Sequence, residues 1–160
     1  MDVAKSVDTP IGTLRLVARE GSLIGVYFPE HEPSPVFGAD ARECDDEPVL
    51  VRAAAQLDQY LTAKRSNFDV PVTMLGTPFQ QDVWNALRTI PFGECVSYRA
   101  LAERIGRPTS IRAVGSANAR NPLSIIVPCH RVIGSDGSLV GYAGGISRKR
   151  WLLDLESGGG

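Results

Sequence analysis

Cysteine and histidine are scarce in this chain, and their scarcity excludes whole classes of protein. The only cysteines among the 160 residues are Cys44, Cys95 and Cys129, which show no regular spacing and no CxxC pair, so the sequence does not indicate a disulfide framework. A closed zinc site would need almost all of these thiols together with the only two histidines, His31 and His130. We therefore expect no metal and no cofactor.

Long apolar runs are missing as well. No stretch approaches the roughly 20 apolar residues that a membrane helix needs. The first six residues lack the apolar segment of a signal peptide. The glycine-rich segment at 141–145 is not followed by Gly-Lys-Ser or Gly-Lys-Thr, so it is not a phosphate-binding P-loop. We expect a cytoplasmic protein without a membrane partner.

The composition is otherwise that of an ordinary globular protein, with 43% apolar and 22% charged residues. Its length allows one domain, or one compact domain with a small neighbour. Charge is distributed unevenly, because residues 1–95 carry 8 basic and 14 acidic side chains whereas residues 96–150 carry 9 basic and 2 acidic ones. A basic half joined to an acidic half indicates an anionic partner on one side, although a solvated basic face would explain the same counts.

The N-terminal half predicts a hairpin, a loop and a helix. Residues 11–18 and 23–28 have the composition of two strands around a turn. Four prolines among residues 29–48 indicate a loop. Residues 49–63 place apolar side chains on one helical stripe, and residues 68–72 allow a short strand.

The second half predicts short helices. Thr77 as N-cap with Gln80 three residues later makes a capping box. Ser97 is expected to cap a further helix that stops near Gly106, and another helix runs over 110–119. Two short helices around a glycine-containing turn, the second of them basic, are typical of a helix-turn-helix.

The helix at 110–119 is unusual for one that reads base edges. Its long basic side chains are Arg112 and Arg120, and its other positions include the small residues Ala113, Gly115, Ser116, Ala117 and Ala119. Such a surface suits close backbone approach in a narrow groove better than base-edge hydrogen bonds. Tight packing on a neighbouring helix is the alternative, and the small residues alone would favour it, whereas the nearby arginines favour the groove.

Residues 125–132 hold the strongest candidate for chemistry. Ile125, Ile126 and Val127 predict a short buried strand, which Pro128 stops because it has no amide hydrogen. Cys129 and His130 follow, and an imidazole is the usual means of making a nucleophilic thiolate. Neighbouring side chains on a strand point to opposite faces, so we expect the imidazole to reach the thiol through a turn or a water. A buried cysteine that acts as a small hydrophobe is the alternative.

The last elements are a turn at 134–137, a glycine-rich loop at 141–145 and a final helix that Ser147 is expected to cap. Cys95 is interpreted as a core residue. Residues 157–160 are expected to form a flexible tail.

In their order and spacing, these motifs resemble the O6-alkylguanine-DNA alkyltransferases, or methylated-DNA–protein-cysteine methyltransferases. The segment at 128–132 is similar to the active-site signature of that family, and the resemblance covers roughly residues 76–156. The motifs that carry it are Phe79-Gln80, Val83-Trp84, Pro91-Phe92-Gly93-Glu94, Ser97-Tyr98, Arg112-Ala113-Val114-Gly115, Asn121-Pro122, Pro128-Cys129-His130-Arg131-Val132, Gly141-Tyr142-Ala143-Gly144-Gly145, Leu152-Leu153 and Leu155-Glu156.

The resemblance implies an α+β protein with two domains. Residues 1–75 would form an RNase H-like domain with a small sheet and a helix. Residues 76–156 would form a mostly helical, winged helix-turn-helix-like domain that binds DNA and accepts the alkyl group. The implied activity is direct, irreversible, single-turnover transfer of the alkyl group of O6-alkylguanine, and also of O4-alkylthymine, from double-stranded DNA by a monomer.

The resemblance also implies a role for each active-site residue. Cys129 would be the nucleophile, and His130 the base that acts through a water. Glu156 would orient the imidazole and favour its protonated form, whose charge would lower the pKa of the thiol. Asn121 would hold the hinge between the DNA-binding helix and the active-site strand. Tyr98 would donate a hydrogen bond to the guanine ring.

The implied DNA contacts lie in the minor groove, with the target base flipped out of the duplex. Arg112 would fill the gap that the base leaves, and the small residues of its helix, Ala113 and Gly115 among them, would lie against the groove. The implied phosphate contacts are Gln80, Arg99, Arg107 and Ser135. The base pocket would be lined by Val132, Tyr142 and Ala143.

Two departures from the family pattern stand out. Some members bind a structural zinc in the N-terminal domain, where this chain offers only His31 and Cys44, so we predict no zinc. Ala143 stands where the family often has serine. The alanine keeps the backbone amide of that position but lacks the serine hydroxyl.

Two other functions remain open at this stage. A non-catalytic helix-turn-helix module that senses alkylated DNA would transfer nothing, and a thiol hydrolase for a small substrate would turn over many times. Stoichiometry separates both from single-turnover repair.

Overall fold

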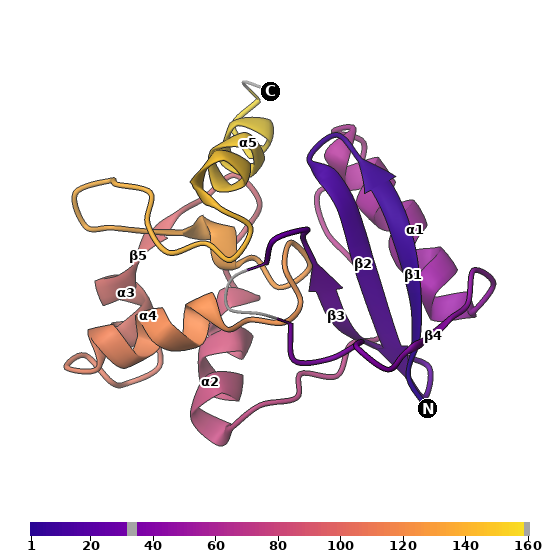
Figure 1. Ribbon diagram of the computed structural model, residues 1–160. Helices are drawn as coiled ribbons and strands as arrows, with labels where there is room; N and C mark the ends of the chain where they lie inside the picture. The colour runs from indigo at the N-terminus through magenta and orange to yellow at the C-terminus, as the bar shows by residue number, and fades with distance from the viewer. Residues whose placement is uncertain (32–34, 159–160) are drawn as a thin grey trace. The chain divides into compact units, whose positions relative to one another are not determined.

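The computed structural model describes residues 1–31 and 35–158, which form two compact units. Unit 1 comprises Met1–Met74 and Pro122–Ile126, and unit 2 comprises Leu75–Asn121 and the chain from Val127 onward. Figure 1 shows the sheet of unit 1 and the helices of unit 2. Parts of the predicted loop at 29–48 and of the predicted tail, residues 32–34 and 159–160, lie outside the described residues.

A four-stranded sheet forms unit 1 together with one helix. Its strands, in the order β3-β2-β1-β4, are β1 (Val3–Thr9), β2 (Gly12–Arg19), β3 (Ser22–Tyr27) and β4 (Arg42–Glu43). Strands β1, β2 and β3 pair antiparallel, and β4 pairs parallel with β1. The predicted hairpin is confirmed as β2 and β3.

The sequence pattern does not predict β1. Ala4 is its only fully buried residue, so the strand lacks the apolar alternation that marks a half-buried strand. Instead, β1 is defined by its pairing with β2, from Val3 opposite Ala18 to Thr9 opposite Gly12. This pairing depends on the partner strand, so the pattern of the β1 segment alone does not predict it.

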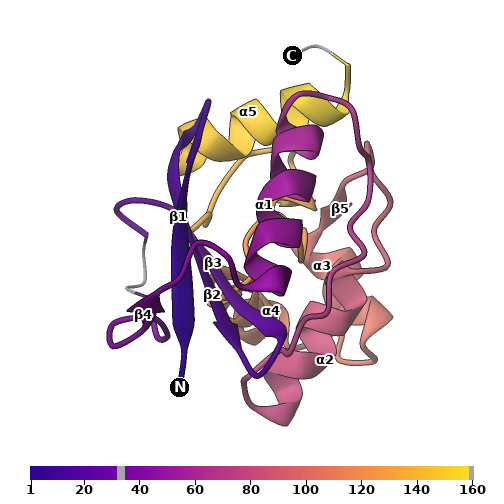
Figure 2. The same cartoon turned by 90° about the vertical axis from the view of Figure 1, so that its right-hand side faces the viewer.

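Helix α1 (Pro48–Leu61) lies against one face of this sheet (Figure 1 and Figure 2). Leu50, Leu57 and Tyr60 on its predicted apolar stripe are fully buried. The carboxylate of Glu47 caps the helix, because it accepts hydrogen bonds from the first backbone N–H groups. The helix ends two residues earlier than predicted.

Two later segments return to strand β3. Leu23 forms an isolated bridge with Val72, so the strand predicted at 68–72 is reduced to a single bridging residue. Val26 forms a second bridge with Leu123, and its N–H donates to the Pro122 carbonyl at 2.8 Å. The chain is thus anchored in unit 1 shortly before it reaches Cys129.

Unit 2 is mostly helical. It contains α2 (Pro78–Leu87), α3 (Tyr98–Arg104), α4 (Ile111–Ala119), α5 (Ile146–Glu156) and two short parallel strands, β5 (Val96–Ser97) and β6 (Val132–Ile133). Helices α2, α3 and α4 pack on one another (Figure 1). The indole N–H of Trp84 in α2 donates to the Ala117 carbonyl in α4 at 2.9 Å, which ties these two helices together.

The helix starts show which local signals are reliable. The capping box is confirmed, because the Thr77 hydroxyl accepts from the Gln80 N–H at 3.1 Å and the Gln80 side chain accepts from the Thr77 N–H at 3.0 Å. The Ser97 cap is confirmed as well. The Ser147 cap is wrong, because α5 begins after Gly145, whose φ of +90° sets the chain direction without any side-chain cap.

Further predictions from the sequence can be compared with the structure. Cys95 is exposed rather than in the core, because it lies in the loop between α2 and β5. Ser157 and Gly158, the first residues of the expected tail, finish α5 through backbone hydrogen bonds to Leu153 and Leu155. Within the described residues, no helix is long and apolar enough to span a bilayer, and no three His, Cys, Asp or Glu side chains gather as metal ligands.

Thr77→Ala tests the capping box. The substitution removes the acceptor for the Gln80 N–H, so the free energy of unfolding should fall by about 1 kcal/mol. Ser147→Ala is the matched control, because this serine caps no helix, and its loss should stay within about 0.5 kcal/mol. Urea denaturation of both variants and the parent measures the difference, and equal losses would contradict this account of the helix starts.

Candidate active site

Cys129 does not end a strand, contrary to the prediction. Residues 124–126 form a turn in which Ile125 has a φ of +72°, and Cys129 opens a 3-10 helix, Cys129–Arg131, that leads into β6. The amides of Ile126 and Cys129 donate to carbonyls only two residues back, Ser124 and Val127, rather than to a neighbouring strand. Tight local turns therefore position Cys129, and the residue is only 3% exposed.

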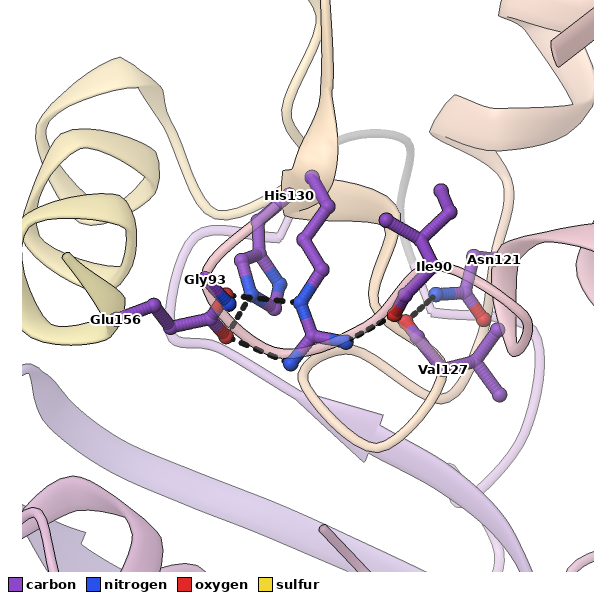
Figure 3. Close-up of polar contacts among 7 residues, drawn as sticks. Ile90, Gly93, Asn121, Val127, His130 and Glu156 are labelled. Carbon is purple, nitrogen blue, oxygen red and sulfur yellow. Dashed lines mark hydrogen bonds and ion pairs between the residues drawn. The ribbon is translucent and has the colours of Figure 1, made fainter. Parts of the chain in front are cut away.

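Asn121 joins the end of α4 to this segment. Its side-chain Nδ2 donates to the Val127 carbonyl at 2.8 Å (Figure 3). A hydrogen bond from the same side chain also lowers the pKa of the Cys129 thiol. Asn121 thus contacts the backbone shortly before the cysteine, and its role as a hinge residue stays a prediction.

His130 and Glu156 are in direct contact. The imidazole Nε2 lies 2.7 Å from Glu156 Oε2, and both side chains are almost completely buried (Figure 3). The carboxylate is an acceptor, so the imidazole donates from Nε2. In the neutral ring Nδ1 is then the acceptor, which is the atom that a general base needs.

Arg131 forms the second contact of Glu156, which the sequence analysis did not assign. Its Nε and Nη2 donate to the two carboxylate oxygens at 2.8 and 2.9 Å, a bidentate pair, and its Nη1 donates to the Ile90 carbonyl at 2.6 Å. The Gly93 N–H adds a longer hydrogen bond to the carboxylate at 3.3 Å. The 3-10 helix, α5 and the loop after α2 therefore meet at one buried carboxylate.

Burial decides the protonation states of the site. It lowers the pKa of His130 against the opposing effect of Glu156, and it raises the pKa of Cys129 to about 11. The expectation that a protonated imidazole lowers the pKa of the thiol is therefore wrong. Arg131 already neutralises the carboxylate, and desolvation dominates both remaining groups. The resting site holds a neutral thiol beside a neutral imidazole.

Lys149 is a second residue that the sequence analysis missed. Its side chain is completely buried in α5, where Nζ donates to the Val140 carbonyl at 2.9 Å and lies 5.8 Å from the centre of the Tyr98 ring. Burial lowers the pKa of Lys149, while its positive charge lowers the pKa of Cys129. A buried lysine costs free energy, and such residues cluster at functional sites. Lys149 is thus a cation that favours the thiolate.

Tyr98 begins α3, and its hydroxyl donates to the Val140 carbonyl at 2.9 Å. Of the residues expected to line the base pocket, Val132, Tyr142 and Ala143 are all buried, and the Tyr142 ring stands edge-on to the His130 ring at 6.5 Å. The structure therefore brings these side chains into the same unit as the thiol, with the imidazole beside Tyr142.

The residues expected to contact DNA lie mostly on the surface of unit 2. Arg112 and Ala113 are exposed on α4, and Gly115 is half-buried there. Arg99, Arg107 and Ser135 are exposed, and the Arg107 guanidinium lies over the Phe79 ring at 5.5 Å. Gln80 is half-buried, with its side-chain oxygen engaged in the capping box.

Family models match both units. The model described as "6-O-methylguanine DNA methyltransferase, DNA binding domain" covers residues 78–158, and the one described as "6-O-methylguanine DNA methyltransferase, ribonuclease-like domain" covers residues 3–74. The chain belongs to this family. The resemblance inferred from the motifs is confirmed, and so is the α+β fold class.

Known members are similar over almost the whole chain. The methylated-DNA–protein-cysteine methyltransferase of Mycobacterium leprae is 45% identical over 95% of this chain and 90% of its own. The crystal structure of the Mycobacterium tuberculosis O6-methylguanine methyltransferase is 42% identical with a TM-score of 0.88, covering 100% of this chain and 95% of that chain. A structure of M. tuberculosis OGT in complex with DNA is 44% identical with a TM-score of 0.89, covering 98% and 93%.

Arg131 and Lys149, the two site residues that the sequence analysis did not assign, differ in how far the sequence could have indicated their roles. Arg131 stands inside the motif at 128–132, but nothing local reveals that its partner is 25 residues away. Lys149 sits in the basic run Arg148-Lys149-Arg150, which has the composition of a solvated face. The position of Lys149 on the helix could have indicated its burial. Lys149, Leu152 and Glu156 are spaced by three and four residues and share the buried side of α5.

Lys149→Met tests the electrostatics of the thiol. Removing the cation should raise the pKa of Cys129 further above about 11, so the thiolate fraction should fall at every pH below it. The rate of iodoacetamide modification of Cys129, followed by peptide mapping between pH 7 and 9, should rise about tenfold per pH unit in the parent and run parallel but lower in the variant. The exposed Lys64→Met is the control. Coincident rates for all three proteins would show that Lys149 does not act on the thiol.

Proposed function

We propose that this chain repairs DNA by irreversible transfer of the alkyl group of O6-alkylguanine to Cys129. The observation that carries the proposal is the buried thiol followed directly by a neutral His130, which Glu156 holds, in the unit that matches the family's DNA-binding domain. The activity is that of a methylated-DNA–protein-cysteine methyltransferase, in which each molecule reacts once because the thioether is not hydrolysed. We extend the substrate to O4-alkylthymine, whose alkyl group is also bonded to an exocyclic oxygen of the base.

The reaction forms one bond and breaks one. Cys129 Sγ attacks the alkyl carbon, and the bond from that carbon to O6 breaks with its electron pair left on guanine. His130 takes the thiol proton through a water, with Nδ1 as the acceptor. The guanine that leaves gains a proton. The net change therefore transfers the thiol proton to guanine, and no cofactor is required. Tyr98 donates a hydrogen bond to the ring as negative charge develops there.

Three groups support the nucleophile during this step. Lys149 contributes a positive charge and Asn121 a hydrogen bond, and both lower the pKa of the thiol. The Arg131–Glu156 pair keeps the imidazole oriented without protonating it. The thiol therefore stays protonated at rest and loses its proton to a neutral base.

DNA binding uses the exposed basic face of unit 2. Helix α4 enters the minor groove, where its small residues Ala113 and Gly115 allow close approach and Arg112 occupies the gap left by the flipped nucleotide. Gln80, Arg99, Arg107 and Ser135 contact phosphates. Val132, Tyr142 and Ala143 line the pocket that receives the base.

The remaining assignments concern the whole chain. We propose that residues 1–75 form the N-terminal domain, residues 76–156 the domain that binds DNA and accepts the alkyl group, and residues 157–160 a tail. We propose a monomer, because one chain supplies every residue of the reaction described above. We also propose that it acts in the cytoplasm, as the sequence analysis predicts.

Mass spectrometry tests the proposed transfer. After incubation with excess O6-methylguanine duplex, the intact mass should increase by one methyl group, located on Cys129 by peptide mapping, with one equivalent repaired per protein molecule. Cys129→Ser should bind the duplex and transfer nothing. An unmodified parent that still binds the duplex would replace the proposal with a sensing module, and repeated turnover would replace it with a hydrolase.

Arg112→Ala separates base flipping from chemistry. The substitution should slow transfer from duplex DNA much more than transfer from free O6-benzylguanine, because only the duplex requires the gap to be filled. Exposed Arg88→Ala on the surface of the same unit is the control. Single-turnover rates on both substrates provide the measurement, and equal losses on the two would remove Arg112 from the flipping step.

A further inference from the structure

Residues 140–145, which we call the pocket loop, lead directly into α5 (Figure 1). The loop carries two of the residues assigned to the base pocket, Tyr142 and Ala143, and both are buried. Gly141 and Gly145 on either side of them have φ values of +66° and +90°, and the Gly145 N–H donates to the Tyr142 carbonyl at 2.9 Å. One turn of this kind does not fix a loop against its surroundings, so the position of the pocket depends on further contacts.

Two consecutive cations in the first turn of α5 hold the two ends of the pocket loop. Lys149 Nζ donates to the Val140 carbonyl at 2.9 Å, and Arg148 Nη1 donates to the Gly144 carbonyl at 3.1 Å. The lysine is buried and the arginine half-buried. Hydrogen bonds from charged donors are stronger than those between neutral groups. The loop is therefore fastened to α5 both before and after the residues that line the pocket.

The Val140 carbonyl has a second donor, the hydroxyl of Tyr98. The distance is again 2.9 Å, the same as that from Lys149 Nζ. A carbonyl oxygen accepts with two lone pairs, so the two donors occupy both. A Cβ atom placed on Gly141 would lie 3.3 Å from the tyrosine hydroxyl oxygen, so this hydroxyl also lies against the loop backbone. Tyr98 thus holds the pocket loop together with the two cations.

The proposed reaction asks Tyr98 for a different hydrogen bond. Its hydroxyl has a single proton, so Tyr98 must leave the Val140 carbonyl when it donates to the guanine ring. The loop then loses one contact at the moment when Tyr142 and Ala143 have to hold the base. The hydrogen bonds from the two cations of α5 do not involve the tyrosine, so they persist after this exchange.

We infer that Arg148 and Lys149 are positioning residues that keep the pocket loop in place when Tyr98 turns from the Val140 carbonyl to the base. For Lys149 this task adds to the effect of its charge on the thiol, whereas Arg148 has had no part in the reaction until now. The inference rests on the base pocket and on the role of Tyr98 proposed above. Because the loop lines the pocket, loosening it weakens binding of the base and leaves the chemistry of the bound base unchanged.

Arg148→Met tests the inference more cleanly than a change at Lys149, which would also alter the thiol. The probe is free O6-benzylguanine, because it has no phosphates and is insensitive to the loss of charge toward DNA. The concentration that gives half the maximal rate of Cys129 alkylation should rise about fivefold, the worth of one hydrogen bond. The maximal rate should stay within about twofold of the parent. Exposed Arg150→Met removes the same charge from the same helix and should change neither quantity.

Hydrogen exchange of the Gly145 amide reports on the pocket loop directly. Arg148→Met should speed this exchange more in a Tyr98→Phe background than in the parent, because the tyrosine no longer holds the loop there. Arg148→Lys keeps a charged donor and should restore the half-saturating concentration to within about twofold of the parent. Arg148→Ala repeats the measurements if the methionine variant does not fold.

The contrary outcomes differ from one another. Equal shifts of the half-saturating concentration in Arg148→Met and Arg150→Met overturn the inference, and so does a loss confined to the maximal rate. Faster iodoacetamide modification of Cys129 in Arg148→Met also overturns it, because unit 2 as a whole would have loosened. A Tyr98→Phe variant that transfers at the parental rate overturns the role of Tyr98 together with this inference. A parent that forms no adduct on Cys129 overturns the proposed function itself.

Discussion

The buried carboxylate of Glu156 is the constraint on which the site depends. A charge in the interior must be compensated, and here Arg131 does so with a bidentate pair while His130 and the Gly93 amide complete the set of donors. These donors come from the 3-10 helix and from the loop after α2, so one carboxylate on α5 ties three parts of unit 2 together. Removing one partner of such a pair typically costs about 3–5 kcal/mol, because the other charge is left buried and unpaired.

The charges around the sulfur are divided between two cations with different tasks. Arg131 neutralises Glu156, which leaves the imidazole of His130 neutral and ready to accept a proton. Among the contacts of the described residues, Lys149 forms no ion pair with a carboxylate. Its Nζ donates to the Val140 carbonyl, and its positive charge lowers the pKa of the Cys129 thiol. The result is a nucleophile that is protonated at rest. In the proposed reaction each molecule reacts once, so a thiol with low intrinsic reactivity would limit its loss to other electrophiles.

Helix α4 connects the two halves of the proposed activity. Its exposed side carries Arg112 and small residues, and its buried side carries Asn118, whose Nδ2 donates to the Cys129 carbonyl. Asn121 follows shortly after the helix ends and donates to the Val127 carbonyl. A helix is a stiff element, so a contact made along one side positions the side chains on the other. The helix that would meet DNA, together with the residues that follow it, therefore also contacts the backbone around the nucleophile.

Features that depend on residues close together in the chain could be predicted before the structure was known: the hairpin of β2 and β3, the capping box of Thr77 and Gln80, and the motif around Cys129 that identifies the family. Turns and caps involve neighbours within about four residues, so composition and spacing are sufficient to locate them. Other features became known only from the folded chain: the 3-10 helix in place of a strand, the pairing of β1, the exposure of Cys95, and the partners of Arg131, Asn118 and Lys149. These depend on residues brought together from as far as 41 positions apart, as with Arg131 and Ile90. The protonation states of Cys129 and His130 depend on burial, which is a property of the packed unit and not of any segment.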